Sequence, residues 1–233
     1  MEKVMCVLWS SSDGDSLRRQ LLEQVVPQML LQDFVHSARI CVEDSAVAAG
    51  AGRRMASREL PSAVLSLWLD ESRRLEELSD LLLAAADRYH AYLVSEAEPL
   101  VNQRTPADGL SRGEGFCQIA FICRPAEMPE SEWLNVWQGS HTQIAIDTQS
   151  TFGYRQNSVV RALTEGAPEA HAIVEENFPE DALHSDHAFY AAADDDTLAR
   201  HQQAMMESCG RFIDFTRIDV LPTSEYLSQP AGP

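Results

Sequence analysis

The sequence predicts an α+β fold in which two βαββαβ units form a barrel within one chain. Two observations support this prediction. Strand-like and helix-like segments follow the same order twice along the 233 residues, and several of the strands are apolar on both faces. A helix layer covers only one face of a sheet, so the other face needs a second sheet. We therefore expect two ferredoxin-like units packed as a dimeric α/β barrel.

The first unit is expected over residues 1–101. Its strands are predicted from short apolar runs, and its helices from apolar residues at spacings of three and four. Asp13–Ser16 provides good N-cap chemistry for the first helix. The predicted elements are a strand at Lys3–Trp9, a helix after Ser16, strands at Phe34–Val42 and Ala63–Leu69 around a loop at 43–62, a helix from Leu75 to Tyr92, and a fourth strand near Leu100.

A polar stretch rich in Gly, residues 102–115, is expected to be a linker. The second unit is then expected over 116–233, with the same order of elements. Pro129 suits the first turn of its first helix. The predicted elements are strands at Phe116–Cys123, Thr151–Leu163 and His171–Phe178, helices after Pro129 and from Asp194 to about Phe212, and a last strand at Thr216–Leu221.

The charge of the chain limits its partners. There are 18 Lys and Arg residues against 36 Asp and Glu, which gives a formal net charge of −18. Such a surface repels phosphate backbones and anionic lipid headgroups, so we expect neither nucleic acid nor a membrane as partner. Lys3 is the only lysine, which leaves no plausible Schiff-base or phosphate-binding lysine.

The five cysteines are odd in number and include no Cys-x-x-Cys pair, and three of them lie inside apolar strands. In such strands a thiol behaves as a small hydrophobic group. The sequence also has no signal-like start and no apolar run long enough to span a bilayer. We therefore expect a reduced, cytoplasmic protein, which could pair further as a homodimer.

Residues 121–160 carry a recognisable set of motifs: Phe121-Ile-Cys-Arg-Pro125, Glu132-Trp133, Trp137-Gln-Gly-Ser-His141 and Gly153-Tyr-Arg-Gln-Asn157. This set resembles the EthD domain, and the resemblance extends over about 116–222. It implies the same barrel fold and a small enzyme like the decarboxylases, dehydratases and cyclases that modify polyketides. The family's histidine is usually followed closely by proline, whereas here Thr142-Gln143 follows.

His141 is the first candidate catalytic residue. It lies one turn after Trp137, on or near the buried stripe of its helix, where a histidine can transfer protons to and from a carbon acid. A structural histidine bonded to a backbone carbonyl is an equal alternative.

Tyr154 and Asn157 are three residues apart on one strand, so a regular strand directs only one of them into the barrel. Tyr154 is the catalytic candidate, because its phenol could orient a substrate oxygen. Asn157, Trp137 and Arg124 are candidate substrate-binding residues. An interior tyrosine with a satisfied hydroxyl, and an ion-paired arginine at the rim, are the ordinary alternatives.

Glu180, His184 and His187 would align as metal ligands on a single helix. The segment is acidic and no fourth ligand is fixed, so a solvated face is the preferred interpretation and no metal site is predicted.

The leading hypothesis is an enzyme of the lyase or isomerase type, without an organic cofactor, acting on a small aromatic or polyketide-like molecule in the barrel cavity. A non-catalytic ligand-binding or assembly protein is the main alternative, and its barrel would be filled by side chains. Haem binding through a histidine is a weaker one. A cavity of about 300 Å³ or more that reaches His141 would favour the enzyme.

Overall fold

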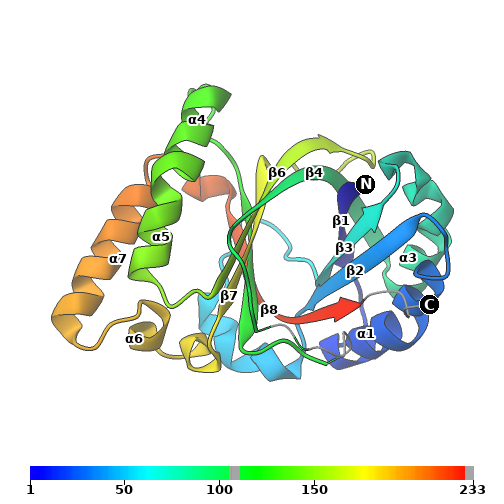
Figure 1. The fold of residues 1–233 in the computed structure, drawn as a ribbon, viewed down its shortest axis with the longest axis horizontal. Coiled ribbons are helices and arrows are strands. Elements are labelled where there is room, and N and C mark those ends of the chain that lie inside the picture. The colour runs from blue at the N-terminus through cyan, green and yellow to red at the C-terminus, as the bar shows by residue number, and fades with distance from the viewer. Residues whose placement is uncertain (105, 107–110, 229–233) are drawn as a thin grey trace.

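The computed structural model describes residues 1–104, 106 and 111–228, which form a closed barrel of eight antiparallel strands. The strand order around the barrel is β1-β3-β2-β8-β5-β7-β6-β4, and Figure 1 shows the ring with helices on both sides. The strands are β1 (Glu2–Trp9), β2 (Val35–Val42), β3 (Ala63–Leu69), β4 (Arg88–Leu100), β5 (Phe116–Ile122), β6 (Gly153–Ala162), β7 (Ala172–Phe178) and β8 (Asp219–Ser228).

The two halves of the chain contribute one sheet each. Strands β4, β1, β3 and β2 are consecutive in the barrel, and so are β8, β5, β7 and β6. The sheets join at two antiparallel seams, β2 with β8 and β4 with β6. Each half has the order βαββαβ, which confirms the predicted pair of ferredoxin-like units closed into one barrel.

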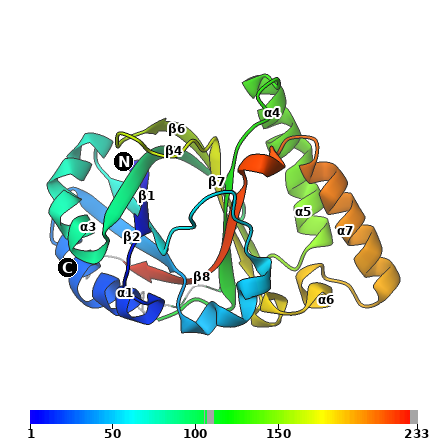
Figure 2. The ribbon, with the colours of Figure 1, turned by 180° about the vertical axis from the view of Figure 1, so that it is seen from behind.

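The helices cover the outer faces of the two sheets. Figures 1 and 2 show α1 and α3 on one flank of the barrel, and α4, α5 and α7 on the other. The first half contains α1 (Gly14–Gln20), α2 (Val26–Met29) and α3 (Ser79–Ala85), with a π-helical turn η1 (Leu21–Val25) and 3₁₀ helices η2 (Ser45–Arg53) and η3 (Ser72–Leu78). The second half contains α4 (Glu130–Val136), α5 (Thr142–Thr148), α6 (Asp186–Phe189) and α7 (Asp195–Cys209), with a π-helical turn η4 (Trp137–His141) and 3₁₀ helices η5 (Glu180–Leu183) and η6 (Phe215–Arg217).

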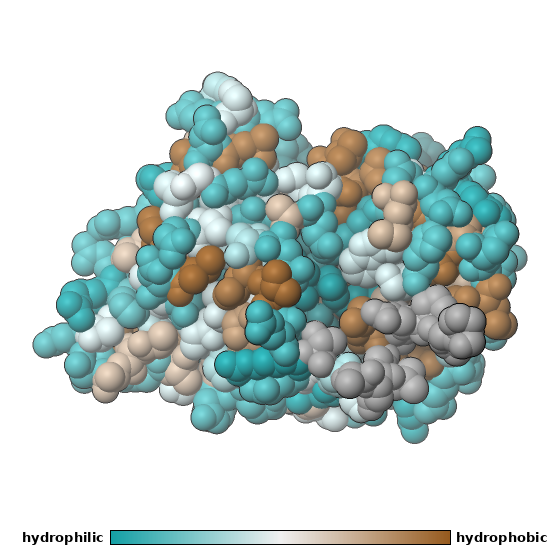
Figure 3. Space-filling model, viewed as in Figure 1, coloured by the Kyte–Doolittle hydropathy of each residue, from teal (hydrophilic) through white to brown (hydrophobic). Residues whose placement is uncertain are grey.

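Several strands, such as β1, β3 and β7, are buried on both faces, as expected for a barrel covered by helices. On β1, Met5 and Val7 belong to the cluster inside the barrel, whereas Val4, Cys6 and Leu8 pack against the helices. This alternation follows from the two-residue period of a strand. On the face in Figure 3, hydrophobic side chains form small patches between hydrophilic ones. No helix in the described ranges is long and apolar enough to cross a membrane.

The predicted helix from Leu75 to Tyr92 is wrong in its second half. The helix ends at Ala85, and β4 begins at Arg88 and pairs with both β1 and β6. Tyr89 and Tyr92 fit a helical spacing and also fit a strand, and the hydrogen bonds of two neighbouring strands decide between them. The short strand expected near Leu100 is the end of this long strand.

Two other expectations need correction. The expected strand at Thr216–Leu221 begins only at Asp219, because Thr216 lies in η6, and it continues to Ser228. The expected loop at 43–62 contains the 3₁₀ helix η2, whose N-cap Asp44 accepts a hydrogen bond from the Ala46 backbone. In the expected linker at 102–115, residues 105 and 107–110 lie outside the described part of the chain.

Candidate active site

A pocket of about 300 Å³ lies between the outer face of the second half's sheet and the helices that cover it. Its floor comes from β5, β6, β7 and β8, and its roof from η4, α6 and α7. Residues 52–55, which come from the first half, also line it. They are held there by Met55, whose backbone pairs with Val220 of β8. One wall of the pocket is therefore supplied by the other half of the chain.

A row of polar side chains crosses the floor. Tyr154 on β6 is the cross-strand partner of Glu176 on β7, and Glu176 is the partner of Gln118 on β5. Partners of this kind have Cβ atoms about 4.5–5.5 Å apart. All three line the pocket, so a ligand on the floor contacts them together.

Glu176 is the carboxylic acid of the row. Its side chain lies among apolar residues with 9% exposure, and no ion pair to it is found within the described ranges. Burial raises the pKa of this carboxyl to about 7, because the charged form loses its hydration without gaining a cation. A carboxyl with a pKa near neutrality can both accept and donate a proton at physiological pH.

Tyr154 is fully buried beside Glu176. Its hydroxyl oxygen accepts a hydrogen bond from the indole nitrogen of Trp137 at 3.2 Å. Burial, together with the nearby Glu176 charge, raises the pKa of this phenol, so it stays protonated. Trp137 and Gln156 are the hydrogen-bond partners of this oxygen, and both act against the rise of its pKa.

His141 lies in the roof, at the end of the π-helical turn η4. Its Nδ1 is 2.9 Å from the hydroxyl of Ser208 on α7, and its ring is 4.6 Å from that of Phe212. Burial lowers the pKa of His141 to about 4, and the charge of Arg211 acts in the same direction. The imidazole is therefore neutral at physiological pH and acts as a hydrogen-bonding group.

The structure brings three of the predicted site residues together: Trp137, His141 and Tyr154 all line the pocket. Their position differs from the expected one, because the pocket lies outside the barrel. The barrel interior is occupied by an apolar cluster and by a network of charged side chains. A space at one end of the barrel, beside Tyr92 and Phe121, measures only about 10 Å³.

The other two predicted residues lie elsewhere. Asn157 points into the barrel, where it accepts from Lys3 at 2.8 Å and donates to the backbone of Ile173. Arg124 follows the end of β5 and donates to the backbone of Met128, outside the pocket. The structure thus places Tyr154 and Asn157 on opposite faces of β6.

Glu176 and the glutamines of the pocket were not predicted from the sequence. The signal for Glu176 was available, since adjacent glutamates interrupt the apolar strand β7 and must face opposite sides. The single helix that would have aligned Glu180, His184 and His187 does not form. His184 follows η5 and His187 lies in α6, where it is 3.1 Å from Asp195. In the described ranges, no three His, Cys, Asp or Glu residues are grouped as metal ligands.

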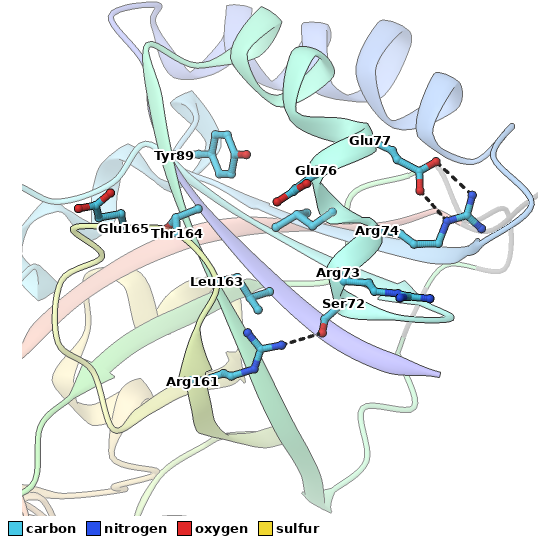
Figure 4. Close-up of a pocket in the computed structure, with 11 residues that line it drawn as sticks. Ser72, Arg73, Arg74, Glu76, Glu77, Tyr89, Arg161, Leu163, Thr164 and Glu165 are labelled. Atoms are coloured by element: carbon cyan, nitrogen blue, oxygen red, sulfur yellow. Dashed lines mark hydrogen bonds and ion pairs between the residues drawn. The ribbon is translucent and has the colours of Figure 1, made fainter.

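A larger groove lies where the two halves meet, between η3 and the ends of β4 and β6, with a volume of about 730 Å³. Figure 4 shows Arg74 paired with Glu77 and Arg161 directed at the hydroxyl of Ser72. Arg73 projects into solvent with 80% of its side chain exposed. The groove is thus a solvated surface with paired charges, and the smaller pocket is the better candidate.

Comparison with known proteins places the chain by its fold. No family model matches it, and no curated protein does. The chain is similar to the crystal structure of an anthrone oxidase-like protein, with a TM-score of 0.61 and 9% identity over 98% of this chain and 91% of that one. It is also similar to a protein of Fusobacterium nucleatum provisionally named a monooxygenase, with a TM-score of 0.51 and 7% identity over 100% of this chain and 95% of that one. At these identities the likeness is one of fold, and the chain is a dimeric α+β barrel whose two ferredoxin-like halves are joined in one polypeptide.

Proposed function

We propose that the pocket above β5–β8 is the active site of an enzyme that transfers a proton on a small, neutral, hydrophobic molecule. The observation that carries this proposal is the Glu176 carboxyl, which is buried with no cation paired to it among the described residues and has its pKa raised to about 7. Perturbed acids of this kind in a cleft are typical of general acid–base catalysis. The pocket volume of about 300 Å³ is within the range of small-molecule sites.

The proposed step is the abstraction of a proton from a carbon next to a carbonyl group. Ionised Glu176 takes the proton, and the electron pair of the C–H bond moves toward the carbonyl, which becomes an enolate. Return of the proton to another carbon gives an isomer, and loss of a leaving group from the neighbouring carbon gives a lyase product. Both outcomes balance without an added oxidant or reductant.

The enolate oxygen needs hydrogen-bond donors in a site that excludes water. Tyr154 is the first donor, because its proton is retained and its oxygen is held by Trp137. His141 is the second, in the tautomer that accepts from Ser208 through Nδ1 and carries the proton on Nε2. With a pKa of about 4, His141 orients the substrate, and Glu176 carries the proton.

This assignment keeps the lyase or isomerase chemistry implied by the resemblance of residues 121–160 to the EthD domain. It moves that chemistry from the barrel interior to the helix layer and adds Glu176 to Tyr154 and His141. The pocket is lined by apolar side chains of α7 and of the segment that follows it, such as Met205 and Phe212, which suits an aromatic or polyketide-like substrate.

The test is hydrogen exchange on a bicyclic ketone. 2-Tetralone is incubated with the protein in D2O at pH 7.5, and loss of the proton signals next to the carbonyl is followed by NMR. We expect exchange above the buffer rate, reduced at least about 100-fold by Glu176→Gln. Glu207→Gln, on the exposed side of α7, is the matched control and keeps the full rate. A wild-type protein that binds the ketone and exchanges no faster than buffer is a binding protein, and the proposal is then wrong.

A further inference from the structure

Gln149 holds a buried polar group in the pocket lining that no other residue satisfies. The side chain is 7% exposed, and its Oε1 has no hydrogen-bond partner. No bond of its amide nitrogen is found either in the described part of the chain. A buried carbonyl oxygen without a partner is uncommon, because its hydration is lost without replacement.

The backbone around Gln149 holds this amide in place. Its own nitrogen closes the end of α5 by donating to Ala145, and the next residue, Ser150, donates to Phe189 of α6 at 2.9 Å. Phe152 then donates to Asn177 at the end of β7. The amide is therefore supplied to the pocket by a backbone bonded to both the roof and the floor, which is the arrangement of a preorganised binding group.

A ligand that satisfies this amide must donate a hydrogen bond. The unpartnered atom is an acceptor, and rotation about the last side-chain torsion exchanges the amide oxygen and nitrogen at low cost. A hydroxyl can donate to the oxygen and also accept from the nitrogen, so it suits either orientation. An ether or a ketone can only accept, and it leaves Oε1 unsatisfied.

The rest of the lining indicates the frame that carries this hydroxyl. Rings of Trp137, Phe189, Tyr190, Phe212 and Phe215 surround the space, together with Met205 and Met206. Aromatic faces and thioethers favour flat, polarizable ligands. Met206 and Phe215 are 58% and 40% exposed, so the entrance is apolar as well.

The charges near the pocket select against anions. Arg53 and Arg54 reach its edge, but Arg53 pairs with Asp186 and stacks on Phe189, and Arg54 pairs with Glu43. On the floor, an ionised Glu176 repels a carboxylate. A ligand with a net negative charge therefore finds no free cation in the described lining.

We infer that Gln149 is a specificity-determining residue that recognises a hydroxyl group on a neutral aromatic molecule. This inference deepens the proposed function and rests on it for the location of the site. It concerns binding alone, so it does not depend on proton transfer by Glu176.

The experiment compares 2-naphthol with 2-methoxynaphthalene, which keeps the rings and the acceptor but lacks the donor. Binding to the full chain is measured by quenching of tryptophan fluorescence. We expect the wild type to prefer 2-naphthol about 10-fold or more, and Gln149→Met to reduce this preference to less than about 3-fold by weakening the binding of 2-naphthol. Gln143→Met, an exposed glutamine on the same helix, keeps the wild-type preference.

Equal binding of both compounds by the wild type would overturn the inference, and so would an unchanged preference in Gln149→Met. Failure of both compounds to bind up to their solubility would also overturn it. Glu176→Gln separates this inference from the proposed function, because it should still prefer 2-naphthol although its exchange activity is lost. If hydrogen exchange depends on Glu176 while the naphthol preference is absent, the proposed function stands and the role of Gln149 is wrong.

Discussion

Glu175 and Glu176 are adjacent on β7, and the pKa values of their carboxyl groups are shifted in opposite directions. Glu175 faces the barrel interior; burial alone would raise its pKa, but the charges of Lys3, Arg155 and Arg39 hold it well below the usual range. Glu176 faces the helix layer, where burial without a cation raises its pKa to about 7. One step along a strand therefore separates a structural carboxylate from a group suited to proton transfer.

The raised pKa of Glu176 makes the stability of the fold dependent on pH. Between pH 4.5 and about 7 the unfolded chain loses this proton while the folded chain keeps it. The contribution of Glu176 to stability is thus fully present below pH 4.5 and is lost as the pH rises through 7. The loss amounts to about 3 kcal/mol. Urea unfolding of the wild type and of Glu176→Gln at pH 4.5 and pH 8 measures this contribution. The other titratable groups are the same in the two proteins, so their effects cancel in the comparison. If the difference in stability between the wild type and Glu176→Gln were the same at both pH values, the assignment would be wrong.

Lys3 is expected to be essential to the barrel interior. Its ammonium group is buried and binds Glu175 at 2.9 Å, Asn157 at 2.8 Å and also Glu96. Lys3→Met removes the closest cation from the buried Glu175, which keeps Arg155 and Arg39 at 3.4 and 3.5 Å, and the loss in the free energy of unfolding is at most about 3–5 kcal/mol. The loss should be smaller at low pH, where Glu175 can take up a proton.

Chemical denaturation at pH 7 measures the effect of Lys3→Met. The exposed Arg73→Met serves as the control and should change stability by less than about 0.5 kcal/mol. A loss below about 1 kcal/mol in Lys3→Met would mean that the network contributes little.

The bond between Trp137 and Tyr154 should appear as coupling between two substitutions. Tyr154→Phe leaves the buried indole nitrogen without an acceptor, at a cost of about 1–3 kcal/mol. In Trp137→Phe/Tyr154→Phe both polar groups are removed, so the double variant should be more stable than the sum of the single losses predicts. A double-mutant cycle from urea unfolding measures the difference, and strict additivity would exclude the bond.

Gly115 and Gly139 form a matched pair for substitution by alanine. Gly115 has a φ of +67°, and a Cβ there would lie 1.9 Å from the carbonyl oxygen of Phe178. Gly115→Ala should therefore lower stability by more than about 2 kcal/mol. Gly139 lies in η4 with nothing within 4 Å of such a Cβ, so Gly139→Ala should raise stability by about 0.5–1 kcal/mol. Thermal unfolding compares the two, and effects of the same sign would contradict the local geometry.

Most of the fold was predictable from the sequence because successive residues of several strands are apolar, which indicates that both faces of these strands are buried. The alternation of Met5 with Cys6 requires apolar cover on both faces, and the barrel provides it. Tyr89 and Tyr92 were assigned to a helix because their spacing fits both structures. Pairing of β4 with β1 and β6 decides that case, and partners distant in sequence are not visible in a local pattern.

The candidate site was predicted in part. The motifs around Trp137, His141 and Tyr154 indicated three residues that the structure brings together. The pocket itself was expected in the barrel interior and lies in the helix layer, because an apolar strand face fits both places equally well. Gln149 carries no sequence signal at all, since its importance comes from a missing hydrogen-bond partner.

The joining of two halves in one chain has a consequence for how such a protein can change. A symmetric dimer made of two identical chains must carry every pocket twice, and every loss of packing is also doubled. Here the helix layer of the first half is packed with aliphatic residues such as Leu17 and Leu21, whereas the layer of the second half encloses a pocket. A substitution in one layer leaves the other unaltered, so the first half can remain a rigid support while the second adapts to new ligands.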